Sequence, residues 1–169
     1  MRGKALLSAL LAIALLAGAA LGQGGGLTPE AVKNGRFFSE LFETKRWVQL
    51  RNGAYSLRQG DDILDIRLIN GALGDLNGDG AGDAAVILST NTGGSGSFIE
   101  LAAVINENGQ PRHVASEELG DRVKVEKIVI NNGVIILNMV VHGPEDPSCC
   151  PTRHTTMRFK LQGNKLVQQ

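Results

Sequence analysis

The fold is decided by two apolar runs near the middle of the chain, Ala84-Ala85-Val86-Ile87-Leu88 and Phe98-Ile99-Glu100-Leu101-Ala102-Ala103-Val104-Ile105. Apolar residues occupy every position of the two runs except Glu100, and a strand with this pattern is buried on both faces. A third run of the same kind covers residues 134–141. The sequence therefore predicts three central strands, around which the rest of the domain is arranged.

The segments outside these runs are typical of strands with one solvent-facing side. Apolar and polar residues alternate over 64–68 and again over 154–161. In the segment 123–130 the alternation changes parity, because Val123 and Val125 face the opposite way from Ile128 and Ile130 in a regular strand. A β-bulge near Glu126-Lys127 would return all four side chains to one buried face.

Short turns connect the predicted strands. Asn52-Gly53 supplies the positive φ angles of a two-residue hairpin turn. The other connections are also short: Asn106 to Pro111, Asn131-Asn132-Gly133 and Gly163-Asn164. Strands joined in this way form an antiparallel meander. We therefore expect a mainly β fold, a single antiparallel β-sandwich or curled barrel-like meander of about eight strands.

The start of the folded region is predicted from local signals. Thr28-Pro29-Glu30 is typical of a helix N-terminus and Asn34-Gly35 ends it, which predicts a short N-terminal helix. The segment 36–43 has apolar residues at spacings that fit either a helix or a strand. We find no internal repeat, and we expect residues 28–169 to form one β domain.

The N-terminus has the organisation of a secretory signal. Arg2 and Lys4 precede an apolar run over 5–17, and small residues follow it. This predicts a signal peptide over 1–22, a flexible leader over 23–27 and an exported protein, periplasmic or extracellular. The alternative is an uncleaved anchor, but the run is shorter than the ~20 residues that span a bilayer. After cleavage, no membrane span remains.

Composition excludes some classes of partner. The 169 residues include 17 basic and 17 acidic side chains, whereas a nucleic-acid-binding surface needs a basic surplus. Aromatic residues make up 4% of the chain, which argues against stacking platforms for bases or sugars. We therefore expect no nucleic-acid partner, and the sequence identifies no ligand or protein partner.

One acidic loop has the spacing of metal ligands. Residues 75–83 read Asp-Leu-Asn-Gly-Asp-Gly-Ala-Gly-Asp, with oxygen side chains at loop positions 1, 3, 5 and 9 and a glycine at position 6. Hard oxygen ligands at these positions suit Ca²⁺, and three close carboxylates require a cation. Five ligands are predicted: Asp75, Asn77, Asp79, the Ala81 carbonyl and Asp83. The alternative is a simple Gly/Asp/Asn-rich turn, and Val86 occupies position 12, where a complete EF-hand has a glutamate.

The loop resembles the calcium loops of dockerins and of FG-GAP repeats, in which such a loop leads directly into a strand. The wider chain resembles an uncharacterised family of exported bacterial proteins. The matching segments are Gly74 to Leu88, Asn91 to Phe98, Leu101 to Val104, Leu119 to Val123, and His142-Gly143-Pro144 through Cys149-Cys150-Pro151-Thr152. This resemblance implies export and a single domain, and it implies no catalytic residue.

Cys149 and Cys150 are the only cysteines and are adjacent. In an oxidising compartment they predict a vicinal disulfide that fixes a turn. The pair could instead join His142 and His154 as zinc or copper ligands. Because adjacent cysteines rarely point at one ion and no C-x2-C spacing is present, the sequence favours the disulfide over zinc or copper.

The expected function is that of a calcium-stabilised β domain that binds a partner or serves a structural role, without catalysis. No G-x-S-x-G elbow, H-E-x-x-H motif or nucleophile–base pair is found. The alternative is an exported hydrolase or a redox or metal protein that uses the loop from His142 to His154.

The signal-peptide prediction is tested by N-terminal sequencing of the exported protein. The first residue should lie between Ala20 and Gln23, because small residues in this region suit signal peptidase. An intact Met1 in a membrane fraction would support the uncleaved anchor instead.

Overall fold

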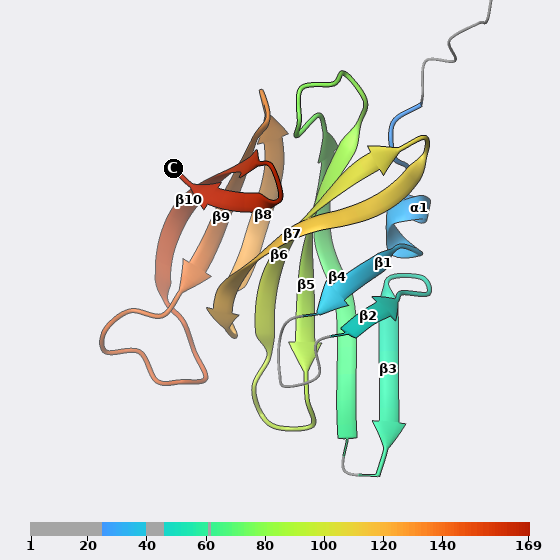
Figure 1. Ribbon diagram of the computed structural model, residues 1–169. Coiled ribbons are helices and arrows are strands. Elements are labelled where there is room, and N and C mark those ends of the chain that lie inside the picture. The colour runs from blue at the N-terminus through green and yellow to red at the C-terminus, as the bar shows by residue number, and fades with distance from the viewer. Residues whose placement is uncertain (1–24, 40–45, 61) are drawn as a thin grey trace, which may run out of the picture.

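The computed structural model describes residues 25–39, 46–60 and 62–169. The predicted signal peptide, residues 1–22, lies outside the described residues. Within them the fold is mainly β, with two sheets and one short helix, α1 (Pro29–Lys33) (Figure 1). Thr28 Oγ1 accepts a hydrogen bond from the Ala31 amide, so the predicted cap and short helix are confirmed.

The strands divide into a large sheet and a small sheet. The large sheet has the spatial order β2 (Arg46–Gln49), β1 (Arg36–Ser39), β7 (Gln110–Asp121), β6 (Phe98–Glu107), β5 (Asp83–Asn91), β4 (Asp62–Gly74) and β3 (Ala54–Gln59). The small sheet has the order β11 (Lys165–Gln168), β10 (Arg153–Gln162), β9 (Val134–Val141) and β8 (Lys124–Asn131).

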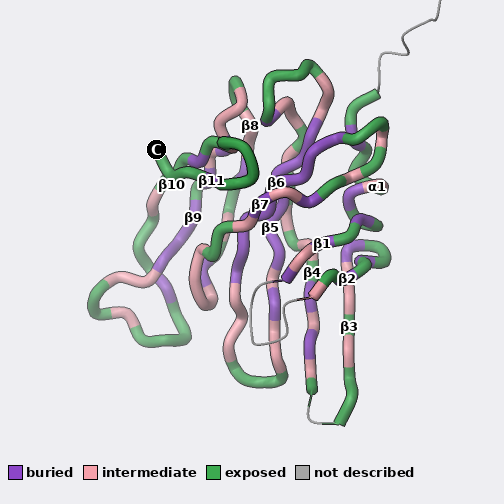
Figure 2. Tube along the Cα trace, in the orientation of Figure 1, coloured by how far each residue is buried: buried purple, intermediate pink, exposed green. Residues whose placement is uncertain are grey.

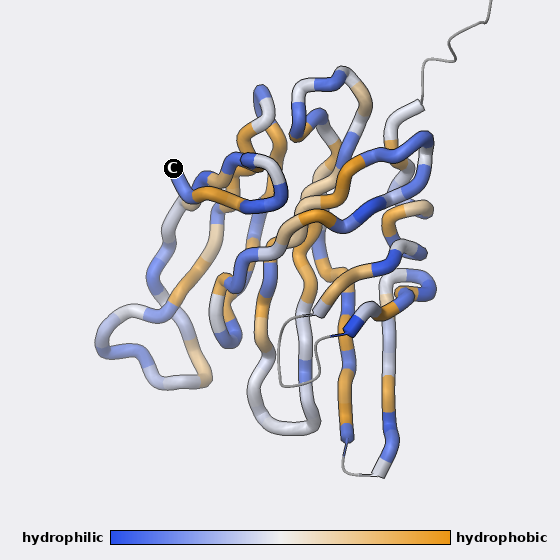
Figure 3. The backbone as a smooth tube through the Cα atoms, viewed as in Figure 1, coloured by the Kyte–Doolittle hydropathy of each residue, from blue (hydrophilic) through white to orange (hydrophobic). Residues whose placement is uncertain are grey.

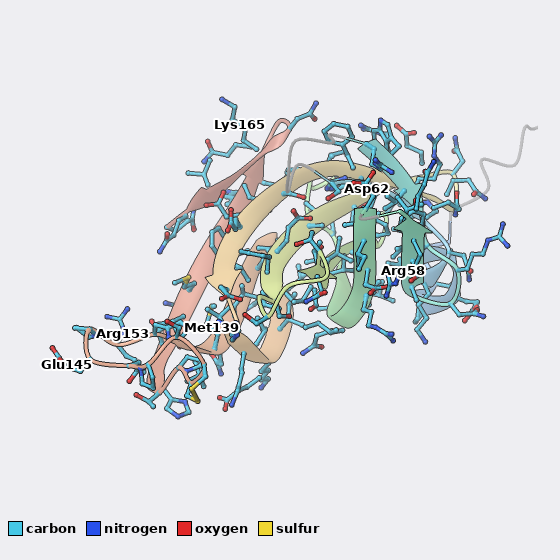
Figure 4. The ribbon with its side chains drawn as sticks, turned by 90° about the horizontal axis from the view of Figure 1, so that it is seen from below. Arg58, Asp62, Met139, Glu145, Arg153 and Lys165 are labelled. Atoms are coloured by element: carbon cyan, nitrogen blue, oxygen red, sulfur yellow. A yellow bond between two sulfur atoms is a disulfide. The ribbon has the colours of Figure 1, made fainter. Side chains whose placement is uncertain are left out.

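The large sheet curls into a nearly closed barrel. Seen from below in Figure 4, its ribbons curve round, and the small sheet lies to one side. The two edge strands, β2 and β3, follow each other in the chain through a tight turn closed by the Arg51–Ala54 bridge. The inside of the curl holds an apolar cluster that we call the barrel core: Leu27, Val32, Phe37, Val48, Leu50, Leu64, Ile66, Ala84, Val86, Leu88, Ala102 and Val104.

A second apolar cluster, which we call the sandwich core, lies between the large and the small sheet. It includes Ile87 and Leu101 from the large sheet and Ile135, Leu137 and Phe159 from the small sheet. The fold therefore combines the two architectures expected from the sequence, a curled barrel and a two-sheet sandwich.

Strands β5 and β6 form the wall that separates the two cores. Along β5, Ala85 and Ile87 face the sandwich core, whereas Ala84 and Val86 face the barrel core. Most of both strands is buried, as Figure 2 shows. Figure 3 shows the contrasting alternation of polar and apolar residues along β4. The three predicted central strands, β5, β6 and β9, all lie inside their sheets, as expected.

The predicted turns and bulge are also confirmed. Asn52-Gly53, Asn108-Gly109 and Asn132-Gly133 all adopt positive φ angles in hairpin turns. The pairing of β8 with β9 shifts register between Val125 and Lys127. This bulge brings the apolar residues on either side of it to the sandwich core: Val123, Val125, Ile128 and Ile130.

The structure differs from the expected meander in strand number and in one pairing direction. The described residues form eleven strands instead of about eight, because strands of only four residues, β1, β2 and β11, occur near both ends of the chain. Strand β1 pairs parallel to β7 through Arg36 and Arg112. A short turn forces the two strands that it joins to pair antiparallel. Strands β1 and β7 are far apart in the sequence, so this restriction does not apply to them. The segment 36–43, which fits either a helix or a strand, begins as strand β1, and 40–43 lie outside the described residues.

Contacts with the domain begin before residue 28, where the domain boundary was expected. The Leu27 amide donates to the Gly82 carbonyl (2.8 Å), and Leu27 is buried. The Asn106 side chain donates to the Gly25 carbonyl (3.0 Å). The last three residues of the expected leader are therefore held against the end of the acidic loop.

Candidate functional site

The acidic loop connects β4 to β5 at one end of the barrel, at the top of Figure 1. Its two flanking strands pair up to Gly74 and Asp83, so the residues between them protrude from the sheet. Gly78 and Gly80 adopt φ angles of 83° and 81°. A side chain is strained in that region, which explains the glycine at loop position 6.

Three successive Asx turns shape this loop. The side-chain oxygens of Asp75, Asn77 and Asp79 each accept the amide two residues further on, at 3.2, 2.9 and 2.7 Å respectively. Asp75 also accepts the amides of Gly78 (2.6 Å) and Gly80 (2.9 Å). Backbone amides of the loop thus fix the orientations of its acidic side chains.

Asp83 has a different role from the other loop carboxylates, because it is fully buried. One carboxylate oxygen accepts a hydrogen bond from the backbone amide of Leu76 (2.9 Å), and the other accepts one from the backbone amide of Asn106 (2.8 Å). Asp83 therefore closes the loop onto itself and ties it to the end of β6. Asn106 in turn holds Gly25, so one hydrogen-bonded chain joins the loop to the N-terminal segment.

Electrostatics favour the ionised form of the loop. The amides of Gly78 and Gly80 donate to Asp75 and hold the pKa of its carboxyl below the usual value. Oδ1 of Asp75 accepts two amides and Oδ2 accepts one, so Oδ2 keeps acceptor capacity for a hard cation. Within the described residues, however, no three His, Cys, Asp or Glu side chains gather closely enough to hold an ion. Calcium binding would therefore require the loop side chains to turn toward a common centre.

The loop between β9 and β10 is organised by Asp146. This carboxylate accepts the amides of Gly143 and Thr152, both at 2.7 Å, and the Thr152 hydroxyl at 2.8 Å. Cys149 and Cys150 are bonded to each other in the exposed part of the loop, with their Cα atoms 3.7 Å apart. The vicinal pair expected from the sequence is therefore present, and Asp146 closes the loop around it.

Arg122 connects this loop to the glycine-rich connection between β5 and β6. Its guanidinium donates to the Ser148 carbonyl (2.8 Å), the Ser95 carbonyl and the Asp121 carboxylate. Its backbone has a φ of 54°, an uncommon conformation for a long side chain. Arg122 therefore braces the β5–β6 connection, which lies at the bottom of Figure 1, opposite the acidic loop.

The two histidines near the cysteines have separate partners. His142 Nε2 lies 3.3 Å from the Asp121 carbonyl, and His154 Nδ1 lies 3.6 Å from a Glu126 carboxylate oxygen. His154 is mostly exposed. This arrangement gives the zinc and hydrolase alternatives little geometric support.

Comparison with known protein families, with curated proteins and with solved structures finds no match. The described helix, α1, is far too short to cross a membrane. The assignment of function therefore depends on the residues of this chain.

Sequence reasoning missed the residues that link the loops to the rest of the fold. Asn106 is expected at the start of a connection but lies within the end of β6, and Arg122 lies in the short connection between β7 and β8. Nothing in the spacing of these two residues indicates their long-range partners. Sequence reasoning also missed the gathering of Phe38, Trp47 and His113 beside β7, where Nδ1 of His113 accepts the Phe38 amide (3.0 Å). Aromatic residues are few in the whole chain, and composition does not indicate that some of them lie together.

The hydrogen bonds of Asp146 predict an acid-dependent loss of stability. The Gly143 amide and Thr152 hold the pKa of this carboxyl below the unfolded value of about 3.9. The stabilisation is therefore present above about pH 4 and is lost as the pH falls through the lower folded pKa. Asp146→Asn should be less stable than wild type near pH 6 and should lose less stability between pH 4 and 2.

Urea unfolding at several pH values measures this difference. Glu145→Gln is a matched control, because Glu145 is exposed and adjacent in sequence. Equal acid slopes for wild type and Asp146→Asn would show that the Asp146 contacts do not stabilise the loop.

Proposed function

We propose that this protein is an exported, calcium-stabilised β domain that acts as a binding or structural module without catalysis. Calcium would be held by the acidic loop, through Asp75, Asn77, Asp79, the Ala81 carbonyl and Asp83. When bound, the ion supplies positive charge that offsets three carboxylates and cross-links the two ends of the loop. Bound calcium would stabilise the folded domain by ordering the connection between β4 and β5.

The observation that carries this proposal is the repeated Asx turn. It spaces the oxygens of Asp75, Asn77 and Asp79 at two-residue intervals along a loop shaped by Gly80. All of the side-chain ligands are hard oxygen donors, the chemistry that Ca²⁺ prefers. Buried Asp83 supports the proposal further, because its hydrogen bonds would transmit ordering of the loop to β6.

Export is supported by the signal-like N-terminus, by the bonded cysteine pair and by the resemblance to exported bacterial proteins. Disulfides persist mainly in oxidising compartments outside the cytosol. These features make a periplasmic or extracellular location the natural setting for the module.

A redox role is the second candidate function, and one observation favours it. The Cys149–Cys150 bond lies in an exposed loop, where a soluble thiol can reach it. The two histidines near it in sequence have other polar partners, the Asp121 carbonyl for His142 and a Glu126 carboxylate for His154. The calcium-stabilised module therefore remains the better-supported function.

The calcium proposal is tested by thermal unfolding in chelator and in calcium. An ion at a hundredfold excess over its dissociation constant stabilises the folded state by about 2.7 kcal/mol. For a domain of this size the melting temperature should rise by roughly 5–10 °C. Asp79→Asn should remove most of this rise, because it deletes a central charge while keeping an oxygen for the Ala81 amide.

Asp62→Asn is the matched control, because Asp62 is an exposed carboxylate at the start of β4 (Figure 4). It should keep the full calcium effect. Extracellular sites bind with constants of about 10⁻⁴ to 10⁻³ M, so the titration must extend to roughly 10 mM calcium. This concentration is about a hundredfold excess for the tighter limit and about tenfold for the weaker one, at which about half of the rise is expected. The loop is only a turn if wild type melts at the same temperature in chelator and calcium and calorimetry detects no binding heat.

A further inference from the structure

An apolar cavity opens at the end of the barrel beside α1. Its volume is about 300 Å³, and its floor consists of the barrel-core residues Val32, Ala84 and Val86. The remaining lining comes from α1 and β4: Pro29, Lys33, Leu68, Ile69, Asn70, Gly71, Ala72 and Leu73. The cavity is therefore continuous with a buried apolar core, as in barrels that bind a ligand at their mouth.

A β-bulge in β4 creates this opening. Leu68 pairs with Leu88, but Asn70 pairs with Ile87, so Ile69 is the extra residue. Beyond the bulge, Gly71 pairs with Val86 and thus lies on the barrel-core side. Because Gly71 has no side chain, no Cβ lies over Val86 at this position, and Gly71 itself is exposed while Val86 is buried beneath it. A Cβ at this position would lie 3.3 Å from Val86 Cγ1.

Two large apolar side chains at this cavity are exposed to solvent. Ile69 is 51% exposed and Leu73 is 45% exposed, and they are two of the four exposed large hydrophobic residues in the described part of the chain. A stable protein–protein interface buries about 800 Å² on each partner, far more than two side chains provide. A small apolar ligand fits this surface better than a second protein.

Lys33 gives the cavity its charge. It is the one charged residue among the lining residues, and no ion pair of Lys33 occurs within the described part of the chain. An ammonium group beside an apolar cavity is complementary to a molecule with an alkyl chain and an anionic head.

We propose that this cavity binds a free single-chain amphiphile with an anionic head group, such as a medium-chain fatty acid. An engineered cavity of about 150 Å³ in another protein holds one benzene molecule, so about 300 Å³ suits an alkyl chain of roughly eight to twelve carbons. The alkyl chain lies against Ile69, Gly71 and Leu73, which are exposed residues of the apolar lining, and the carboxylate faces Lys33. Such an amphiphile is then the class of ligand that the proposed binding module takes. None of the residues that line the cavity is a proposed calcium ligand.

Isothermal titration calorimetry of the purified protein in chelator tests this proposal separately from the calcium loop. Decanoate, decan-1-ol and decyltrimethylammonium, each below its micelle concentration, compare one chain length with three head groups. Decanoate should bind in saturable 1:1 fashion, at least fivefold more tightly than the alcohol and more tightly still than the cation. Octanoate should bind about tenfold more weakly than decanoate, because two methylenes are lost.

Two exposed residues allow variants that should fold normally. Lys33→Glu should reverse the preference between decanoate and the cation, whereas Lys165→Glu, on the distant β10–β11 hairpin (Figure 4), should leave it unchanged. Ile69→Ser should weaken decanoate binding about tenfold, whereas Val167→Ser, at another exposed apolar residue, should not.

Three results would overturn the proposal. The first is the absence of saturable decanoate binding, and the second is decanoate binding that is indifferent to both Lys33→Glu and Ile69→Ser. The third is a different occupant of the surface. This occupant would be a second copy if Ile69→Ser abolishes a concentration-dependent dimer, or a membrane if phosphatidylglycerol vesicles bind while decanoate does not.

Discussion

The burial of both faces of the β5–β6 pair is the constraint on which the rest of the structure depends. One face needs the barrel core and the other needs the sandwich core, so neither the curled sheet nor the small sheet can be removed without exposing apolar surface. The curl of the large sheet, the position of α1 and the packing of β8 to β11 all satisfy this requirement. The loops at the two ends of the barrel are then placed by the strands that they connect.

Those end loops are held by polar contacts, in contrast to the cores. Asp83 and Arg122 bond to backbone groups in distant segments, whereas Asp146 bonds to backbone groups within its own loop. A buried or partly buried carboxylate with several amide donors is ordered only when all of its partners are in place. One hydrogen-bonded network therefore surrounds the acidic loop at one end of the barrel, and Arg122 links the opposite end to the loop of the small sheet that carries the bonded cysteines.

The sequence was sufficient for the features that are local or periodic. Continuous apolar runs predicted β5, β6 and β9, and alternation predicted β4, β8 and β10. Asn-Gly pairs predicted turns, and the parity change at Lys127 predicted the β8 bulge. Contacts between distant segments leave no such trace, so the parallel pairing of β1 with β7 was not foreseen. The bulge at Ile69 was missed because apolar Ile69 directly follows Leu68, and this hides the change of face. The acidic loop was found by spacing, but the anchoring of Asp83 by Asn106 was not.

The central claim, that one two-faced strand pair unites both cores, is tested most directly by native-state hydrogen exchange in wild type and Leu101→Ala. Leu101 is fully buried and faces only the sandwich core. If the cores unfold as one unit, the opening free energies of amides in both β4 and β9 should fall together by about 2–5 kcal/mol. A fall confined to β9, with β4 unchanged, would contradict the claim, because the barrel would then be stable without the sandwich core.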